Sequence, residues 1–290
     1  RLVELAQERF PVEVRNTRRM EEIVDLRNPQ LWYPLARLRK RRIIYHGGPT
    51  NSGKTYQAIE RLKKAGANRG SGDDNGPAGI FCGPLRLLAL EVYEQLNSQG
   101  VYCSLMTGQE KREVPFATHV SCTIEMVNTS NEYEVAVIDE IQMLADEQRG
   151  PSWTAAVLGL NCPEIHVCGG MEGAVLVEAL AKEMGDDFEL HEYRRKTKLL
   201  CAEESLHNNY KNMEAWDAVV AISRKDIFSI KREIETRSDH KCCVIYGSLP
   251  QETRAHQARL FNNEGTGYDV LVASDAIGMG LNLNIRRCVY

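Results

Sequence analysis

The sequence predicts an α/β protein built from two parallel-sheet domains. Its 290 residues exceed the length of one typical domain. Short, continuous apolar runs alternate with helix-like stretches, as expected for parallel strands that helices cover on both faces. A glycine-rich loop lies between the first apolar run and a helix-like stretch, within residues 46–62. These observations favour layered α/β domains with a ligand site where a strand ends.

The apolar runs are the predicted strands. They lie at residues 42–47, 78–84, 118–123, 133–140 and 164–170, and again at 216–223, 241–247 and 268–274. Helical periodicity is found at residues 84–96 and 224–235. The polar run 194–198, "RRKTK", separates the two sets of strands. We therefore predict a helical lead-in over residues 1–42, a first domain over 43–195 and a second domain over 196–290. The Gly-, Asn- and Asp-rich segment 66–79 is predicted to be a mobile loop.

The glycine-rich loop fits the pattern G-x-x-x-x-G-K-[ST] of a phosphate-binding loop. Glycines let the backbone turn its N–H groups toward phosphate oxygens, beside the positive end of a helix. Lys54 would reach the β- and γ-phosphates of a nucleotide, and the Thr55 hydroxyl would bind Mg²⁺. The strand before the loop and the helix after it favour this interpretation over a turn with a chance lysine. The predicted nucleotide-binding residues of the loop are Gly48, Pro49, Thr50, Asn51, Ser52, Gly53, Lys54 and Thr55.

A second motif, "VAVIDEIQML" at residues 135–144, places two acids at the end of an apolar strand. Ligands of parallel sheets bind at that end. Asp139 is a candidate Mg²⁺ ligand, and Glu140 is a candidate general base for an attacking water. The alternative is a strand that ends in solvated acids, which the loop upstream makes less favoured. Gln142 is positioned to report the state of the nucleotide to a neighbouring surface.

Composition excludes several classes of protein. No apolar run approaches the ~20 residues that span a bilayer, and the net charge of −4 excludes a uniformly basic nucleic-acid-binding surface. The nine cysteines form no C-x-x-C pair, so a zinc site has no support. Their use indicates a reducing compartment, which is the cytosol, the nucleus or the interior of an organelle. The first residue is not methionine, so we expect a fragment or a processed chain from which a targeting sequence is missing.

Three classes of protein with a phosphate-binding loop remain at this point. They are a translocating helicase, a nucleoside kinase of the thymidine-kinase type, and a nucleotide-gated binding module without motor activity. The kinase class predicts a compact single domain, usually with a four-cysteine zinc loop. The binding-module class predicts no second domain that faces the nucleotide. The segment that separates these classes is "VLVASDAIGMGLNLN" at residues 270–284.

Together with "GPTNSGKT", "GPLRLLALE", "TGQEK", "VAVIDEIQM" and "VIYGSLPQETR", that segment resembles a superfamily 2 helicase in order and spacing. The amino-acid sequences of these motifs are most similar to those of the mitochondrial RNA degradosome helicases, which are ATP-dependent DExH/D-type enzymes. The resemblance begins at about Leu31 and extends to the last residue. It implies two RecA-like domains in tandem, the second one truncated at its C-terminus, with ATP and Mg²⁺ as cofactors.

The resemblance also implies a function and a location. It implies 3′-to-5′ movement on RNA and unwinding of RNA duplexes, with DNA duplexes as a further candidate substrate. An exoribonuclease is the implied partner in a degradosome, the mitochondrial matrix is the implied compartment, and no membrane is involved.

The helicase pattern assigns further site residues. The residues implied to contact RNA are Pro84, Arg86, Thr107, Gly108, Thr123 and Glu125 in the first domain and Ser248, Ser274 and Asp275 in the second. Gly278, Gly280 and Asn282 are implied to connect RNA to the nucleotide. Hydroxyls and backbone amides bind phosphates without a large positive charge, which agrees with the net charge.

The chain departs from the family pattern at three points. Gly170 follows the Cys-Gly of the coupling motif, where this branch usually has an acidic residue, and Ser274 replaces a commoner threonine. The arginine motif Q-x-x-G-R-x-G-R does not occur within the 290 residues. We do not expect Arg286 and Arg287 to substitute for it, so we expect ATP binding with little RNA-stimulated hydrolysis and no unwinding by these residues alone.

Overall fold

A computed structural model describes residues 9–12, 15, 28–67, 76–207, 209–278 and 281–290. The chain divides into two compact units, and residues 198–290 form most of the second unit. Each unit is described by itself below. The predicted α/β class with two parallel sheets is confirmed.

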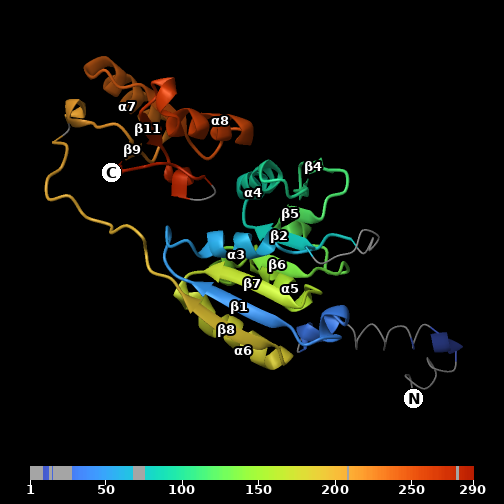
Figure 1. Cartoon of the computed structure of the whole chain (residues 1–290). Coiled ribbons are helices and arrows are strands. Elements are labelled where there is room, and N and C mark those ends of the chain that lie inside the picture. The colour runs from blue at the N-terminus through green and yellow to red at the C-terminus, as the bar shows by residue number, and fades with distance from the viewer. Residues whose placement is uncertain (1–8, 13–14, 16–27, 68–75, 208, 279–280) are drawn as a thin grey trace. The chain divides into compact units, whose positions relative to one another are not determined.

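The first unit contains an eight-stranded sheet in the order β4-β3-β5-β2-β6-β7-β1-β8 (Figure 1). All neighbouring strands run parallel except β3 and β4, which are antiparallel. The strands are β1 (Arg42–Gly47), β2 (Gly79–Gly83), β3 (Cys103–Met106), β4 (Lys111–Arg112), β5 (His119–Thr123), β6 (Val135–Ile138), β7 (Glu164–Gly169) and β8 (Asp187–Glu192).

Helices cover both faces of this sheet. Residues of α5 (Gly150–Gly159) and α6 (Ala174–Met184) share a buried cluster with Tyr45, Ile138 and Val167 of the central strands. Helix α3 (Lys54–Leu62), which begins directly after the phosphate-binding loop, buries Ala58, Ile59 and Leu62 against the other face (Figure 1). Helix α4 (Arg86–Ser98) follows β2, and its residues up to Glu91 are grouped with the second unit. The loop between β1 and α3 is therefore held between a buried strand and a buried helix face.

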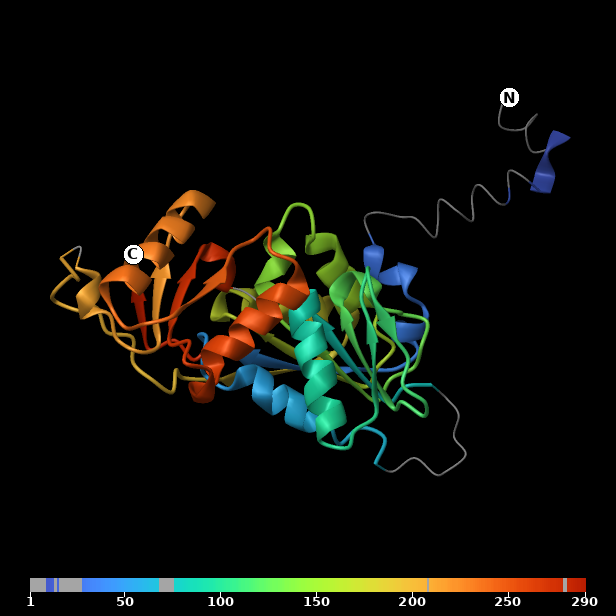
Figure 2. The same ribbon diagram turned by 90° about the horizontal axis from the view of Figure 1, so that it is seen from above.

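The second unit contains a four-stranded parallel sheet in the order β10-β11-β9-β12. Its strands are β9 (Asp217–Val220), β10 (Cys242–Ile245), β11 (Val270–Ala273) and β12 (Arg287–Val289). Ile227 and Ile234 of α7 (Arg224–Arg237) pack on one face, and Phe261 of α8 (Gln251–Asn262) packs on the other (Figure 2). Within the described ranges, each helix is too short or too polar to serve as a membrane span.

The eight predicted strands are all present, whereas β3, β4 and β8 were not predicted. Most of the predicted lead-in over residues 1–42 lies outside the described residues, as does the centre of the predicted loop at 68–75. Between residues 28 and 42 the chain forms two short 3-10 turns, Pro29–Trp32 and Leu35–Arg37. All nine cysteines are free thiols, and seven are buried.

The basic run at residues 37–42, "RLRKRR", leads into β1 and is part of the packing of the first unit. The side chains of Arg41 and Asp186 are both almost completely buried, with Nη2 of the arginine 2.6 Å from Oδ2 of the carboxylate. Arg41 also donates from Nη1 to the carbonyl of Leu160 at 3.1 Å. Arg39, in contrast, forms an exposed ion pair with Glu132. The run thus closes the end of the sheet beside β1 and β8.

We expect Arg41→Ala to destabilise the first unit by about 3 kcal/mol or more, because the carboxylate of Asp186 would stay buried without its main partner. Arg39→Ala is the matched control, and it should cost less than about 1 kcal/mol because its ion pair is exposed. Urea unfolding followed by circular dichroism measures both values. Equal destabilisation by the two substitutions would contradict the structural role of Arg41.

Candidate functional site

The phosphate-binding loop runs from the end of β1 to the first turn of α3. Asn51 and Gly53 both adopt left-handed backbone conformations, with φ of 57° and 87°. A Cβ on Gly48 would lie 2.6 Å from the carbonyl oxygen of Tyr193, so only glycine fits there without a shift of the backbone. Glycine also adopts the conformation of residue 53 without steric cost. The two glycines of the sequence motif are therefore required by the shape of the loop.

Two polar side chains of this loop are buried. The Lys54 side chain folds back over the loop, and its Nζ lies 3.4 Å from the carbonyl oxygen of Pro49. The hydroxyl of Ser52 has no hydrogen-bonding partner among the described residues, although Ser52 is only 6% exposed. A buried hydroxyl without a partner is costly unless a ligand completes its hydrogen bonding. The loop therefore fits a group rich in acceptor oxygens, such as a phosphate.

The acid pair meets this loop at the end of β6. The Thr55 hydroxyl donates to Oδ1 of Asp139 at 3.2 Å, although the two residues are 84 positions apart. The same oxygen accepts the backbone N–H of Glu140 at 3.0 Å. Burial, followed by the neighbouring charge of Glu140, raises the pKa of Asp139 to about 7, against the opposing effects of Lys54 and the two hydrogen bonds. A nearby cation would favour the ionised carboxylate.

Mg²⁺ is compatible with the oxygens of Thr55 and Asp139. It binds proteins through one or two carboxylates and keeps waters and substrate phosphates as its other ligands. No cluster of three or more His, Cys, Asp or Glu side chains suited to a metal is found in the described part of the chain. A two-residue site completed by phosphate needs no such cluster.

Gln142 links the acid pair to the residues that follow β7. Its Nε2 donates to the carboxylate of Glu140, and its Oε1 accepts the backbone N–H of Gly170 at 3.4 Å. A Cβ on Gly169 would lie 2.5 Å from Cγ2 of the buried Ile141 and 2.8 Å from Oε1 of Gln142, so a side chain at residue 169 would displace its neighbours. The predicted relay residue thus contacts both the candidate base and the coupling motif.

His46 lies in β1, directly before the loop. Its Nδ1 is 2.8 Å from the Tyr193 hydroxyl, and its Nε2 is 2.8 Å from Nδ1 of His166. Burial, and then the neighbouring imidazole of His166, lower the pKa of His46 to about 4. His46 therefore stays neutral at physiological pH and acts as a packing residue within the sheet.

The predicted RNA-contact residues of the first domain follow three neighbouring parallel strands. Pro84 and Arg86 follow β2, Thr107 and Gly108 follow β3, and Thr123 and Glu125 are at the end of β5 and in the turn after it. Because the strands are parallel, these positions share one edge of the sheet, the edge that also carries the loop after β1. The hydroxyl of Thr107 already has a hydrogen-bonding partner within the protein, because it donates to the carbonyl of Glu110 at 3.1 Å.

No sequence pattern indicates Arg149, which joins two of these predicted contact segments. Its guanidinium donates to the carbonyl of Pro84 and lies 2.7 Å from the carboxylate of Glu125. The same group lies 5.2 Å from the centre of the Trp153 ring, whose Nε1 donates to the carbonyl of Asp139 at 3.0 Å. Arg149 precedes α5 as the single basic residue of the segment "DEQRG", so no motif marks it.

In the second unit, the predicted site residues follow the neighbouring strands β10 and β11. Ser248 comes after β10, and Ser274 comes directly after β11, where its hydroxyl accepts the N–H of Ala276 at 3.2 Å. Asp275 and Gly278 bound a short 3-10 turn, and Gly280 lies outside the described residues. The carbonyl of Asn282 accepts a hydrogen bond from Asn262 at 2.7 Å, so Asn282 is held against α8.

Arg287 is engaged within its own unit. Its Nη2 lies 2.6 Å from Oδ2 of Asp217, whose side chain is almost completely buried. Its Nη1 lies 3.4 Å from the carboxylate of Glu214. This arginine therefore anchors β12 to β9. That Arg287 does not replace the arginine motif stays a prediction, and its ion pair with Asp217 favours it.

Comparisons with known proteins agree with this geometry. The DEXQ-box helicase domain of Suv3 matches residues 29–193, and the helicase conserved C-terminal domain matches residues 197–290. Among solved structures, a Saccharomyces cerevisiae Dbp5 variant bound to Gle1 has a TM-score of 0.61, with 17% identity, over 84% of this chain and 67% of that one. The Escherichia coli helicase HrpB has a TM-score of 0.55, with 13% identity, over 83% of this chain and 33% of that one. At such identities the likeness shows the fold alone, which is that of RecA-like helicase domains.

Curated relatives are far more similar in sequence. The mitochondrial ATP-dependent RNA helicase DExH18 of Arabidopsis thaliana is 51% identical over 99% of this chain and 36% of its own length. The mitochondrial ATP-dependent RNA helicase SUV3L of Oryza sativa is 52% identical over 96% of this chain and 36% of its own. The mouse mitochondrial ATP-dependent RNA helicase SUPV3L1 is 47% identical over 93% of this chain and 34% of its own. The chain spans about a third of the length of these three relatives. With a Suv3-type DEXQ-box domain over more than half of its residues, the chain belongs to the Suv3 family of helicases.

Proposed function

We propose that this chain is the motor core of an ATP-dependent RNA helicase. The observation that carries the proposal is the 3.2 Å hydrogen bond between Thr55 and Asp139, which joins the phosphate-binding loop to the acid pair. The sequence similarity to helicases named as ATP-dependent and RNA-directed supports the choice of nucleotide and substrate.

The residues of the first unit would divide the work as follows. Lys54 and the backbone N–H groups of residues 50–55 bind the phosphates, and Ser52 donates its free hydroxyl to a phosphate oxygen. Thr55 and Asp139 would hold Mg²⁺, which supplies charge neutralisation to the phosphates when bound. Glu140 accepts a proton from the attacking water. Gln142, in contact with Glu140 and Gly170, passes the state of the site to the coupling motif.

RNA would bind along the edges where the parallel strands of each domain end. We keep the predicted domains, 43–195 and 196–290, as the two halves of this motor. Pro84, Arg86, Thr107, Gly108, Thr123 and Glu125 would hold the strand from the first half, and Ser248, Ser274 and Asp275 would hold it from the second. Gly278, Gly280 and Asn282 would connect that contact to the nucleotide.

The wider role rests on the resemblance and on the names of the relatives. Relatives named as mitochondrial support a location in the mitochondrial matrix. The resemblance supports 3′-to-5′ movement, RNA duplexes and secondarily DNA duplexes as substrates, and an exoribonuclease as the partner. The nucleoside-kinase alternative is not favoured, because the match over residues 197–290 is to a helicase domain. The same match disfavours a binding module without motor activity.

The test is a strand-displacement assay with the full-length protein, Mg²⁺ and ATP, on RNA duplexes that carry a 3′ or a 5′ single-stranded tail. The proposal predicts ATP-dependent displacement of the 3′-tailed duplex. ATP hydrolysis that RNA does not stimulate, with no displacement of either duplex, would contradict it.

Lys54→Ala should weaken the binding of the fluorescent analogue mant-ATP by about tenfold or more, because it removes a charged hydrogen-bond donor to phosphate. Glu140→Gln should retain mant-ATP binding but lower ATP hydrolysis by about 10²-fold or more, because it removes only the base. Fluorescence titration and a phosphate-release assay measure the two effects. An equal loss of nucleotide affinity in both variants would count against these roles.

Arg86→Ala should weaken RNA binding about equally for all base sequences. For one lost contact to a single strand, the slope of log K against log salt should become shallower by about 0.7. Arg237→Ala, an exposed arginine paired with Glu233 on α7, is the control and should leave the slope unchanged. Fluorescence anisotropy with labelled RNA over a range of salt concentrations gives both slopes. A changed base preference with an unchanged slope would refute the assignment.

A further inference from the structure

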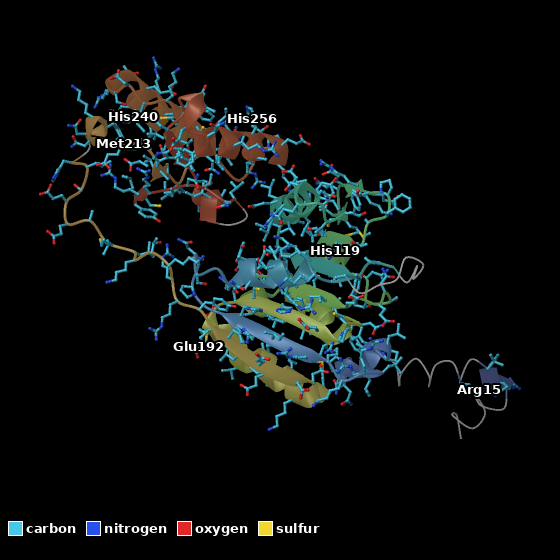
Figure 3. The ribbon with its side chains drawn as sticks, in the orientation of Figure 1. Arg15, His119, Glu192, Met213, His240 and His256 are labelled. Atoms are coloured by element: carbon cyan, nitrogen blue, oxygen red, sulfur yellow. The ribbon has the colours of Figure 1, made fainter. Side chains whose placement is uncertain are left out.

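The five residues directly after β8, residues 193–197, lie along the phosphate-binding loop, and we call them the strap. The strap begins next to Glu192 at the end of β8 (Figure 3). The backbone N–H of Tyr193 donates to the carbonyl of Gly47 at 2.7 Å, and the N–H of Lys196 donates to the carbonyl of Asn51 at 3.1 Å. All of these residues belong to the first unit. The strap therefore follows the loop from its entry to its central turn.

Arg195 makes the side-chain connection between strap and loop. Its Nη1 donates to both the carbonyl and the hydroxyl oxygen of Thr50, at 3.2 and 2.9 Å. Its Nε donates to the carbonyl of Thr197 at 2.9 Å, which holds the turn of the strap itself. One guanidinium thus fixes the strap and the loop to each other.

The loop needs this support because of Asn51. Its left-handed backbone, with φ of 57°, persists only where the surroundings hold it. The strap holds Asn51 twice, since the carbonyl accepts the N–H of Lys196 and the side-chain amide donates to the Thr197 hydroxyl at 3.1 Å. Thr50, held by Arg195, is the residue before it. The strap therefore sets the backbone of the loop where it turns toward Ser52 and Gly53.

The strap also brings positive charge to the loop. A Cβ on Gly53 would lie 3.3 Å from Nζ of Lys196, so this ammonium group is in contact with the turn that precedes Lys54. Arg194, the neighbouring residue of the same charge, is exposed. Cations gathered at a helix start are unfavourable on their own and favourable beside a polyanion.

We propose that Arg195 is a positioning residue of the nucleotide site, which holds Thr50 and Asn51 in the conformation that binds phosphates. The proposal rests on the proposed function, because it assumes that the loop binds a nucleotide. It assigns a role in nucleotide affinity to residues that the loop motif does not contain. Because coupling is reciprocal, nucleotide binding stabilises the strap in turn. The strap is the last part of the first unit, so nucleotide binding acts on the chain where it passes into the second unit.

The test measures the affinity of the 290-residue chain for mant-ATP with Mg²⁺. Arg195→Ala should weaken affinity by about three- to tenfold, the effect of one or two hydrogen bonds on a partly exposed group. Arg195→Lys keeps the charge and one donor, so it should restore part of the affinity. Arg194→Ala, the matched control, should bind like the unmodified chain. A thermal melt of each variant checks that the fold is retained.

Two further measurements separate positioning from simple attraction between charges. In a double-mutant cycle with Thr50→Val, the effect of Arg195→Ala should shrink, because the valine has already removed one shared hydrogen bond. Hydrogen exchange of a peptide that covers residues 193–197 should slow when mant-ATP binds. Equal losses of affinity in Arg194→Ala and Arg195→Ala, or additive effects in the cycle, would overturn the proposal in favour of general electrostatics.

Failure of this inference is distinct from failure of the proposed function. If Lys54→Ala weakens binding as predicted and Arg195→Ala does not affect it, the nucleotide site stands and the role of Arg195 is wrong. If the unmodified chain does not bind mant-ATP, the proposed function itself fails.

Discussion

The parallel register of three central strands places every group of the nucleotide site. Tyr45 of β1 is level with Val167 of β7, and Val167 is level with Ile138 of β6. The carboxyl ends of the three strands are therefore level, and the loop, the glycines and the acids that follow them share one edge. Both strands are buried on both faces, so a slip of one residue between β6 and β7 would exchange side chains between two packed faces, and the fit of these side chains to their neighbours also fixes the register. The contact between Thr55 and Asp139 is a consequence of this ladder.

Charge in the first unit is divided between packing and ligand binding. Arg41 and Asp186 are paired and buried at one end of the sheet, where they support the fold. Lys54 and Ser52 are buried at the opposite end of β1. The Ser52 hydroxyl has no hydrogen-bonding partner among the described residues, and the Lys54 ammonium group contacts the carbonyl of Pro49 at 3.4 Å. Such incomplete satisfaction is costly in a core and is expected where a ligand completes the hydrogen bonds. A chain with a net charge of −4 can therefore still present a site for a polyanion.

Sequence reasoning succeeded where a signal is local. Strands such as β1 and β6 are buried on both faces, so their apolar runs stand out, and the loop and acid motifs mark their own chemistry. The edge strand β8, "DFELHE", alternates charged and apolar residues and has little burial, so it lacked that signal. Arg149 and Arg195 act through residues far away in the chain, which no local pattern reveals. The run that contains Arg195 predicts only a domain boundary, because charge density indicates exposure but not a partner.

The order of strands in the first sheet has a consequence for how the chain folds during synthesis. Strand β1 is made first of the eight, but both of its neighbours, β7 and β8, are made last. His46 must wait 120 residues for its partner His166, which takes on the order of ten seconds at ribosomal rates of about 5–20 residues per second. During that interval the apolar residues of β1 have no strand to pair with, while β2, β5 and β6 can already associate. The nucleotide loop therefore forms late, and the emerging chain needs protection from aggregation at the very segment that later binds the ligand.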